Sequence, residues 1–108
     1  MNYAIEILPE AELDLRYIYE YISETLLDTE AAKHVYLRLK AAITSLSEMP
    51  ARYAVYETAP WKSKGVRKMP VGKFLVFYIA KEESCSVHIL RILYGGRDLA
   101  ECLSKGIL

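Results

Sequence analysis

The sequence predicts an α+β fold of order β-α-α-β-β-β, with an N-terminal helical hairpin packed on one face of a mostly antiparallel four-stranded sheet. Three observations predict it. Two long segments carry apolar residues at spacings of three and four, a very short connection joins them, and three strand-like segments follow. The chain has 108 residues, no internal repeat and no linker, so we expect a single domain over residues 1–108.

The first strand and the helical hairpin are predicted from residues 2–50. Residues 2–8, NYAIEIL, alternate in polarity as strands do, and Pro9 suits the first turn of a helix. Asp28 is the expected N-cap of the second helix, and Pro50 marks its stop. Because the connection is so short, the helices must run antiparallel and bury one face each. The apolar stripes are Ala11, Leu15, Ile18, Ile22 and Leu26 in the first helix and Ala32, Val35, Leu39, Ala42 and Leu46 in the second.

Three strands are predicted in the second half of the chain, over residues 66–71, 73–80 and 86–94. Gly72 connects the first two, and residues 81–84, KEES, form a polar hairpin turn before the third. The segment FLVFYIA is apolar on both faces and is therefore expected in the centre of the sheet. Residues 51–65 show no clear period, so they form a functional loop or an element that the pattern does not reveal.

Composition places the chain among soluble globular proteins, since 53% of its residues are hydrophobic and 26% are charged. No apolar run approaches the length that spans a bilayer, and the N-terminus lacks the pattern of a signal peptide, so we expect a cytoplasmic protein without a membrane partner. The two cysteines, Cys85 and Cys102, are expected to be reduced thiols. Neither they nor His34 and His88 show metal-ligand spacing, so we expect no metal and no cofactor.

Charge is unevenly distributed although the net charge is zero. Residues 1–60 hold five Lys and Arg against ten Asp and Glu, whereas residues 61–108 hold nine against four. Such a chain either presents a cationic face to a polyanion or carries a solvated charge mosaic without a partner. The acids of the first helix are expected on its solvated outer side: Glu10, Glu12, Asp14, Glu20 and Glu24.

Two groups of side chains are candidates for function. Tyr17 and Tyr21 lie one helical turn apart beside the apolar stripe, where they either widen the buried face or form an exposed aromatic edge. Metal-free RNA cleavage needs a general base, a general acid and cations for the phosphorane charge. His88 and Tyr94 are expected on one face of the last strand and could supply the first two, although a lone histidine on a strand is more often a structural residue. The candidate cations, from neighbouring strands and turns, are Lys62, Lys64, Arg67, Lys68, Lys73, Arg91 and Arg97.

Over nearly its whole length the sequence resembles the RelE/ParE superfamily of toxins from type II toxin–antitoxin systems. The resemblance rests on EAELDLRYIYEYI, on the second helix ending in LSEMP, on GVRKMPVGKFLVFYIA, and on the last strand and its exit, VHILRILYGGRD. It implies a growth-inhibiting toxin of an addiction (plasmid-stabilisation) module, held as a hetero-oligomer by a cognate antitoxin. RelE-like members cut mRNA on the ribosome, whereas ParE-like members act on DNA gyrase without cleaving RNA.

The sequence departs from the ribonuclease pattern at three places. Pro70 stands where ribonucleases carry an Arg, Phe74-Leu75 replaces a Tyr-Arg pair, and a C-terminal Tyr would fall near Leu103; Arg97 fits a late family arginine. These departures favour a ParE-like, non-enzymatic gyrase inhibitor. The alternatives are a RelE-like ribosome-dependent endoribonuclease and an inactive interaction module.

Each hypothesis assigns residues. For the ribonuclease, the catalytic candidates are Lys64, Arg67, His88, Tyr94 and Arg97. For binding of antitoxin or target, the candidates are Tyr17, Tyr21, Trp61, Lys62, Lys68, Lys73 and Arg91. In either case we expect the open face of the sheet, flanked by cations, to be the working surface.

Overall fold

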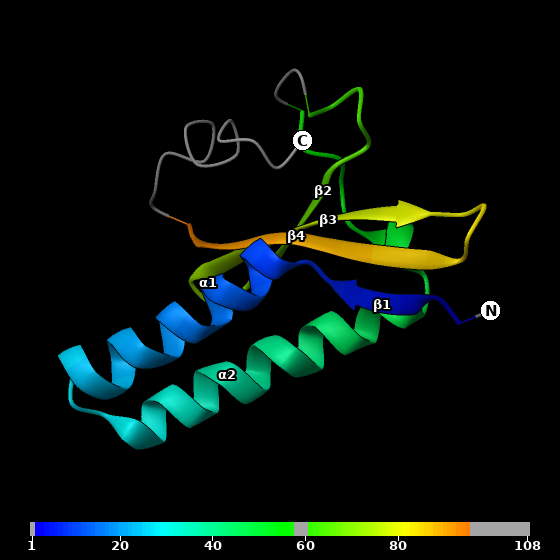
Figure 1. Cartoon of the computed structure of the whole chain (residues 1–108). Helices are drawn as coiled ribbons and strands as arrows, with labels where there is room; N and C mark the ends of the chain where they lie inside the picture. The colour runs from blue at the N-terminus through cyan, green and yellow to red at the C-terminus, as the bar shows by residue number, and fades with distance from the viewer. Residues whose placement is uncertain (1, 58–60, 96–108) are drawn as a thin grey trace.

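The computed structural model describes residues 2–57 and 61–95 and confirms the predicted α+β order. Two helices lie side by side in one layer and a four-stranded sheet forms the other (Figure 1). The elements are β1 (Ala4–Ile7), α1 (Pro9–Glu20), α2 (Thr29–Thr44), β2 (Arg67–Val71), β3 (Phe74–Lys81) and β4 (Ser86–Tyr94). Within the described ranges no helix has the length and apolar character needed to cross a membrane.

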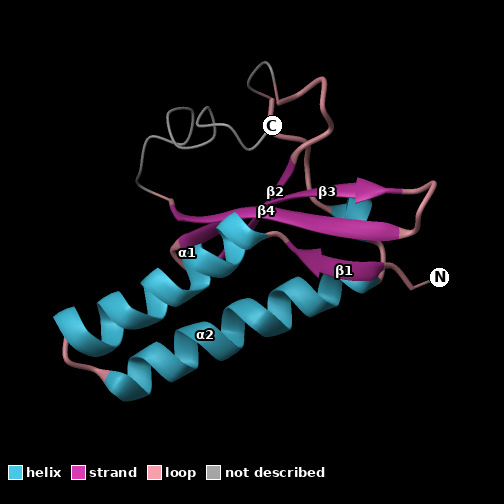
Figure 2. Ribbon diagram, in the orientation of Figure 1, coloured by secondary structure: helices cyan, strands magenta, loops and turns pink. Residues whose placement is uncertain are grey.

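The sheet has the strand order β1-β4-β3-β2 and is mixed (Figure 2). β1 runs parallel to β4, while β3 runs antiparallel to both β4 and β2. β3 therefore lies in the interior of the sheet, as its two apolar faces predict, and β4 shares that place. The parallel pair arises because the helical hairpin returns the chain to the far edge, so that the last strand comes to lie against the first.

Local signals set the beginnings of the two helices. The predicted stop of the second helix is wrong, because α2 ends at Thr44 and Pro50 begins a separate short helical turn. Pro9 is the first residue of α1, and the Asp28 side chain caps α2 by accepting a hydrogen bond from the Ala31 N–H at 3.0 Å. The end of the first stripe is predicted wrongly, because Leu26 is 57% exposed. A π-helical turn over Tyr21–Thr25 follows α1, and its wider ring rotates the later residues out of the stripe.

The main core lies between the helices and the sheet. Ala11, Leu15, Leu39 and Ile43 from the helices pack on one face of the sheet. Tyr78 belongs to that face, and its hydroxyl donates a hydrogen bond to the Pro50 carbonyl, which anchors the chain after α2. Burial raises the pKa of Tyr78 to about 12. The residues of the sheet in this core are Met69, Val71, Val76, Tyr78, Val87, Ile89 and Ile92.

The opposite face of the sheet is not open, contrary to the sequence prediction. Trp61 and Val66 pack there on Phe77, Leu90 and Leu93 in a second, smaller core. The Tyr56 ring, which lies in the same cluster, meets the Phe77 ring edge-on at a centroid distance of 5.4 Å. The segment between α2 and β2, which showed no sequence period, thus covers this face of the sheet with apolar side chains. Aromatic packing therefore takes the place of the polar working surface that the sequence predicted there.

Candidate functional site

A bidentate ion pair joins α1 to β4. Arg91 Nε and Nη2 donate to Asp14 Oδ2 and Oδ1 at 2.7 and 3.0 Å, and the Ile92 N–H donates to Oδ2 at 2.8 Å. β1 pairs with β4 only as far as Ile89, so the carboxylate satisfies a strand-edge N–H that no strand reaches. Two predictions are corrected: Asp14 is buried, 9% exposed, and does not lie on the solvated side, and Arg91 is neutralised at the helix–sheet junction.

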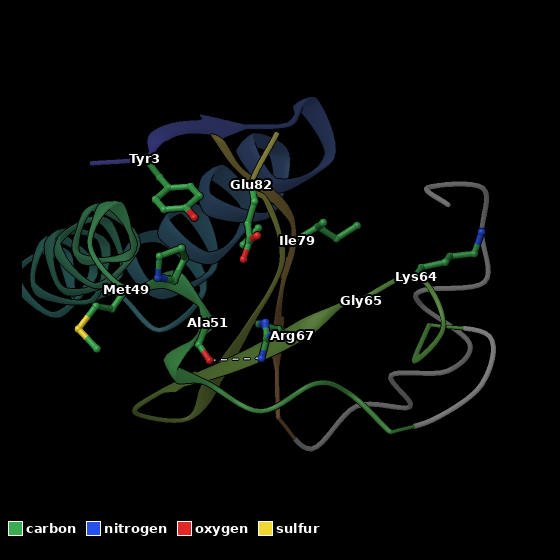
Figure 3. A pocket seen from close by; sticks show the side chains of 10 residues that line it. Tyr3, Met49, Ala51, Lys64, Gly65, Arg67, Ile79 and Glu82 are labelled. Atoms are coloured by element: carbon green, nitrogen blue, oxygen red, sulfur yellow. Dashed lines mark hydrogen bonds between the residues drawn. The ribbon is translucent and has the colours of Figure 1, made fainter. Parts of the chain in front are cut away.

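Arg67 is bound to the chain that follows α2. Its Nη1 donates to the carbonyl oxygens of Tyr53 and Ala51 at 2.7 and 3.3 Å, so the guanidinium holds this segment against β2. A cleft of about 390 Å³ lies beside it, with Tyr3, Met49 and Glu82 on its walls (Figure 3). Lys64 lines the same cleft, but its side chain extends away from the Arg67 guanidinium in Figure 3.

His88 and Tyr94 lie on opposite faces of the sheet, so the prediction of a shared face is wrong. In the register of β3 and β4, Tyr78 pairs with Ile89 and Phe77 with Arg91, which leaves Leu90 as an extra residue. An extra residue reverses the alternation beyond it. His88 lies opposite Ile79, on the side of the second core, and its Nε2 is 3.4 Å from Glu6 Oε2. Tyr94 lies opposite Phe74, on the side of the main core, at a ring centroid distance of 5.9 Å.

Tyr17 and Tyr21 form an exposed aromatic edge, the second of the two predicted arrangements. Their exposed fractions are 61% and 52%, and Leu13, one turn before Tyr17, is 43% exposed. We call these three residues the α1 ridge. At about 100° per residue, Tyr17 and Tyr21 lie within about 60° of Asp14 on the helix surface. The ridge therefore borders the junction of α1 with β4.

The remaining predicted binding residues are dispersed. Trp61 is 5% exposed in the second core, so its side chain is a packing residue and not a surface contact. Lys62 pairs with Glu57 at 2.9 Å on the surface, and Lys68 Nζ lies 5.5 Å from the centroid of the Tyr56 ring. Lys73 follows Gly72 in the turn between β2 and β3. Arg97 and Leu103 lie outside the described residues, as does Cys102.

One hollow was not predicted from the sequence. It has a volume of about 360 Å³ and lies between α2 and the β2–β3 turn. Its lining residues are His34, Val35, Arg38, Leu39, Val71, Gly72, Lys73 and Phe74. His34 and Arg38 stand one helical turn apart, a spacing that is visible in the sequence, but only the tertiary structure brings them to the turn. In the described part of the chain, no group of three His, Cys, Asp or Glu side chains is arranged to hold a metal ion.

Comparison with known proteins identifies the family. The sequence model described as the ParE toxin of the type II toxin–antitoxin system, parDE, matches residues 5–99. The chromosomal ParDE toxin–antitoxin system from P. aeruginosa has a chain that matches with a TM-score of 0.70 and 21% identity, over 85% of this chain and 95% of that chain. No curated protein sequence matches the chain.

Two further solved structures have the same fold. The RelBE2 toxin–antitoxin complex from Mycobacterium tuberculosis matches with a TM-score of 0.62 and 19% identity, over 87% of this chain and 99% of that chain. A double arginine-to-alanine mutant of the E. coli toxin RelE in the free state matches with a TM-score of 0.66 and 16% identity, over 99% and 96% of the two chains. At these identities the structural likeness shows the fold, which the ParE and RelE branches share. Because the family model covers most of the sequence, the chain belongs to the ParE toxin family of type II toxin–antitoxin systems.

Proposed function

We propose that this toxin inhibits DNA gyrase by binding to it in the cytoplasm, without cleaving RNA, and that a cognate antitoxin neutralises it in a hetero-oligomer. The observation that carries the proposal is the apolar character of the positions where ribonucleases of the superfamily hold polar groups. Phe74 packs against the main core and Leu75 against the second core, while Pro70 lies on β2. Phe74 and Leu75 contribute to stability, Pro70 is exposed, and none of the three offers a charge to a substrate.

Two of the candidate cations support the same proposal. A phosphorane-like transition state needs donors aimed at its developing charge, and the loss of one such donor costs roughly 3 to 4 kcal/mol. Arg67 is occupied by two backbone carbonyls, and Arg91 is occupied by Asp14. The bulge at Leu90 places His88 and Tyr94 on opposite faces, so one phosphate could not contact both.

The α1 ridge is the surface that we assign to the antitoxin. It exposes a leucine and a tyrosine on α1 and a second tyrosine at the start of the π-helical turn, and large aromatic side chains of this kind are enriched among the residues that contribute most to binding. The RelBE2 structure from Mycobacterium tuberculosis and the archaeal RelE–RelB structure from Pyrococcus horikoshii are both complexes of a toxin with its antitoxin. An antitoxin that covers the ridge would also cover the α1–β4 junction beside it.

A gyrase assay with purified components tests the proposal. The free toxin should block supercoiling of relaxed plasmid or trap cleaved DNA, and an equimolar amount of its antitoxin should restore supercoiling. No effect at a large molar excess over gyrase would refute the gyrase hypothesis. The matched measurement in cells is pulse labelling of DNA, RNA and protein synthesis after induction, in which DNA synthesis should fail first.

The second candidate is a ribosome-dependent endoribonuclease, which the cleft beside Arg67 favours because Lys64 lines it as well. In a translation extract this activity would cut mRNA within codons, and Lys64→Ala or Arg97→Ala would abolish the cuts. Intact mRNA would eliminate it. Harmless overexpression without antitoxin would instead indicate an inactive interaction module.

A further inference from the structure

The hollow between α2 and the β2–β3 turn combines an apolar floor with a cationic rim. Val35 and Leu39 from α2 face Val71 and Phe74 from the strands, and they form the floor. Arg38 and Lys73 stand at the rim, and none of the lining residues is acidic. Its volume, about 360 Å³, lies within the range of roughly 300–1,000 Å³ that is usual for ligand pockets.

Gly72 leaves room for the Arg38 guanidinium beside the turn. It has a φ of +58°, which L side chains rarely adopt, and a Cβ at this position would lie 3.1 Å from Arg38 Nη1. A side chain at residue 72 would therefore have to displace the guanidinium slightly. With glycine, the guanidinium lies against the turn, next to the hollow.

The two cations of this rim have no side-chain partner among the residues that the structure describes, unlike several arginines elsewhere in the fold. The side chains of Arg38 and Lys73 make no hydrogen bond or ion pair with any residue of the ranges 2–57 and 61–95. In contrast, Arg52, Arg67 and Arg91 are held by carbonyls or a carboxylate. Two unpaired cations thus stand beside an apolar hollow whose lining holds no acidic residue.

We propose that this hollow receives an apolar side chain from an acidic segment of a protein partner, whose carboxylates pair with Arg38 and Lys73. The apolar floor selects an apolar group, and the unpaired cations select acids on either side of it. A single-stranded nucleic acid fits less well, since it needs a groove of cations and aromatic faces along several nucleotides. The inference rests on the proposed function, because the partner that we assign to the hollow is the antitoxin.

The hollow and the α1 ridge are formed by different elements of the fold. The ridge lies on α1 and the first residue of the π-helical turn after it, whereas the hollow is formed by α2 and the β2–β3 turn. An antitoxin chain that reached both would bind through two elements. The loss of one element should then weaken the complex without abolishing it.

Calorimetric titration of the full-length toxin with the antitoxin encoded beside it tests the inference. The double variant Arg38→Gln/Lys73→Gln should weaken binding about tenfold, most strongly at low salt. Val35→Thr, which keeps the shape of the floor but adds a hydroxyl, should weaken it about fivefold. The matched control is Lys33→Gln/Lys81→Gln, which removes two exposed cations that do not line the hollow and should leave the affinity unchanged. All variants should melt within a few degrees of wild type, which excludes misfolding as the cause.

The possible outcomes separate this inference from the proposed function. If the wild type binds antitoxin and both hollow variants bind equally well, the inference is wrong while the toxin–antitoxin assignment stands. If the charge variants keep antitoxin binding but lose gyrase inhibition, the hollow belongs to the target and the assignment to antitoxin is overturned. If they lose only the binding of a labelled 20-nucleotide single strand, measured by anisotropy, a nucleic acid is the occupant. If the wild type neither binds antitoxin nor inhibits gyrase, the proposed function itself fails.

Discussion

Removing the Asp14 carboxylate should be the most damaging single charge change on α1. Asp14→Ala leaves the Arg91 guanidinium without its bidentate partner and the Ile92 N–H without an acceptor. Breaking one side of a buried ion pair costs about 3–5 kcal/mol, because the remaining charge stays desolvated. The side chains are 10% and 19% exposed, so Arg91 regains some water, and we expect about 3 kcal/mol. For a domain of this size, that loss lowers Tm by roughly 10–20 °C.

Urea unfolding followed by fluorescence of the single, buried tryptophan, Trp61, measures this effect. The control is Glu20→Ala, an exposed acid on the same helix, which should change the free energy of unfolding by less than about 0.5 kcal/mol. A double-mutant cycle with Arg91→Ala should give a coupling energy above about 1 kcal/mol. If Asp14→Ala costs less than about 1 kcal/mol, or if the two substitutions are additive, the ion pair does not join α1 to the sheet as argued.

Three further predictions concern other features. Tyr78→Phe removes the hydroxyl that donates to the Pro50 carbonyl, and it should lower the free energy of unfolding by about 1–2 kcal/mol, measured by urea unfolding. Because folding raises the pKa of Tyr78 from 10.0 to about 12, its contribution is fully present below pH 10 and is lost as the pH rises towards 12. Urea midpoints from pH 8 to 11 should therefore fall more steeply for wild type than for Tyr78→Phe, and parallel curves would contradict the burial argument. Tyr17→Ala/Tyr21→Ala should reduce antitoxin affinity at least tenfold by calorimetry, whereas Leu37→Ala, exposed on α2, should not, and equal effects would remove the α1 ridge as the binding surface. Trp61→Ala should destabilise the fold by about 3–5 kcal/mol in thermal melts monitored by circular dichroism, and a loss below about 1 kcal/mol would show that the second core is dispensable.

The toxin family and the fold were accessible from the sequence because their signals are local. The alternation of residues 86–94, the apolar run of β3 and the spacing of the two helical stripes each arise within one segment. Pro9 and Asp28 act on neighbouring backbone groups, so the beginnings of α1 and α2 were predicted to the residue. Gly72 likewise has a positive φ in the turn where the sequence placed it.

The candidate site was predicted less well, because its geometry depends on contacts between distant segments. Asp14 and Glu12 have the same chemistry in the same helix, and only the guanidinium of Arg91, 77 residues later, makes one of them a buried ligand. One extra residue in β4, Leu90, moves Tyr94 to the face opposite His88. The sequence around Leu90 contains no pattern that predicts this bulge.

Residue type and helical or strand period thus determined what this chain is: an α+β toxin of the ParE family with two amphipathic helices and a central apolar strand. The tertiary structure alone decided which charges remain available. It pairs Arg67 with a backbone carbonyl and Arg91 with a carboxylate, and it buries Trp61. It leaves Arg38 and Lys73 beside an apolar hollow. The physical reason is that side-chain direction repeats within an element and can be read from spacing, whereas the partner of a charge is set by the packing of elements far apart in sequence.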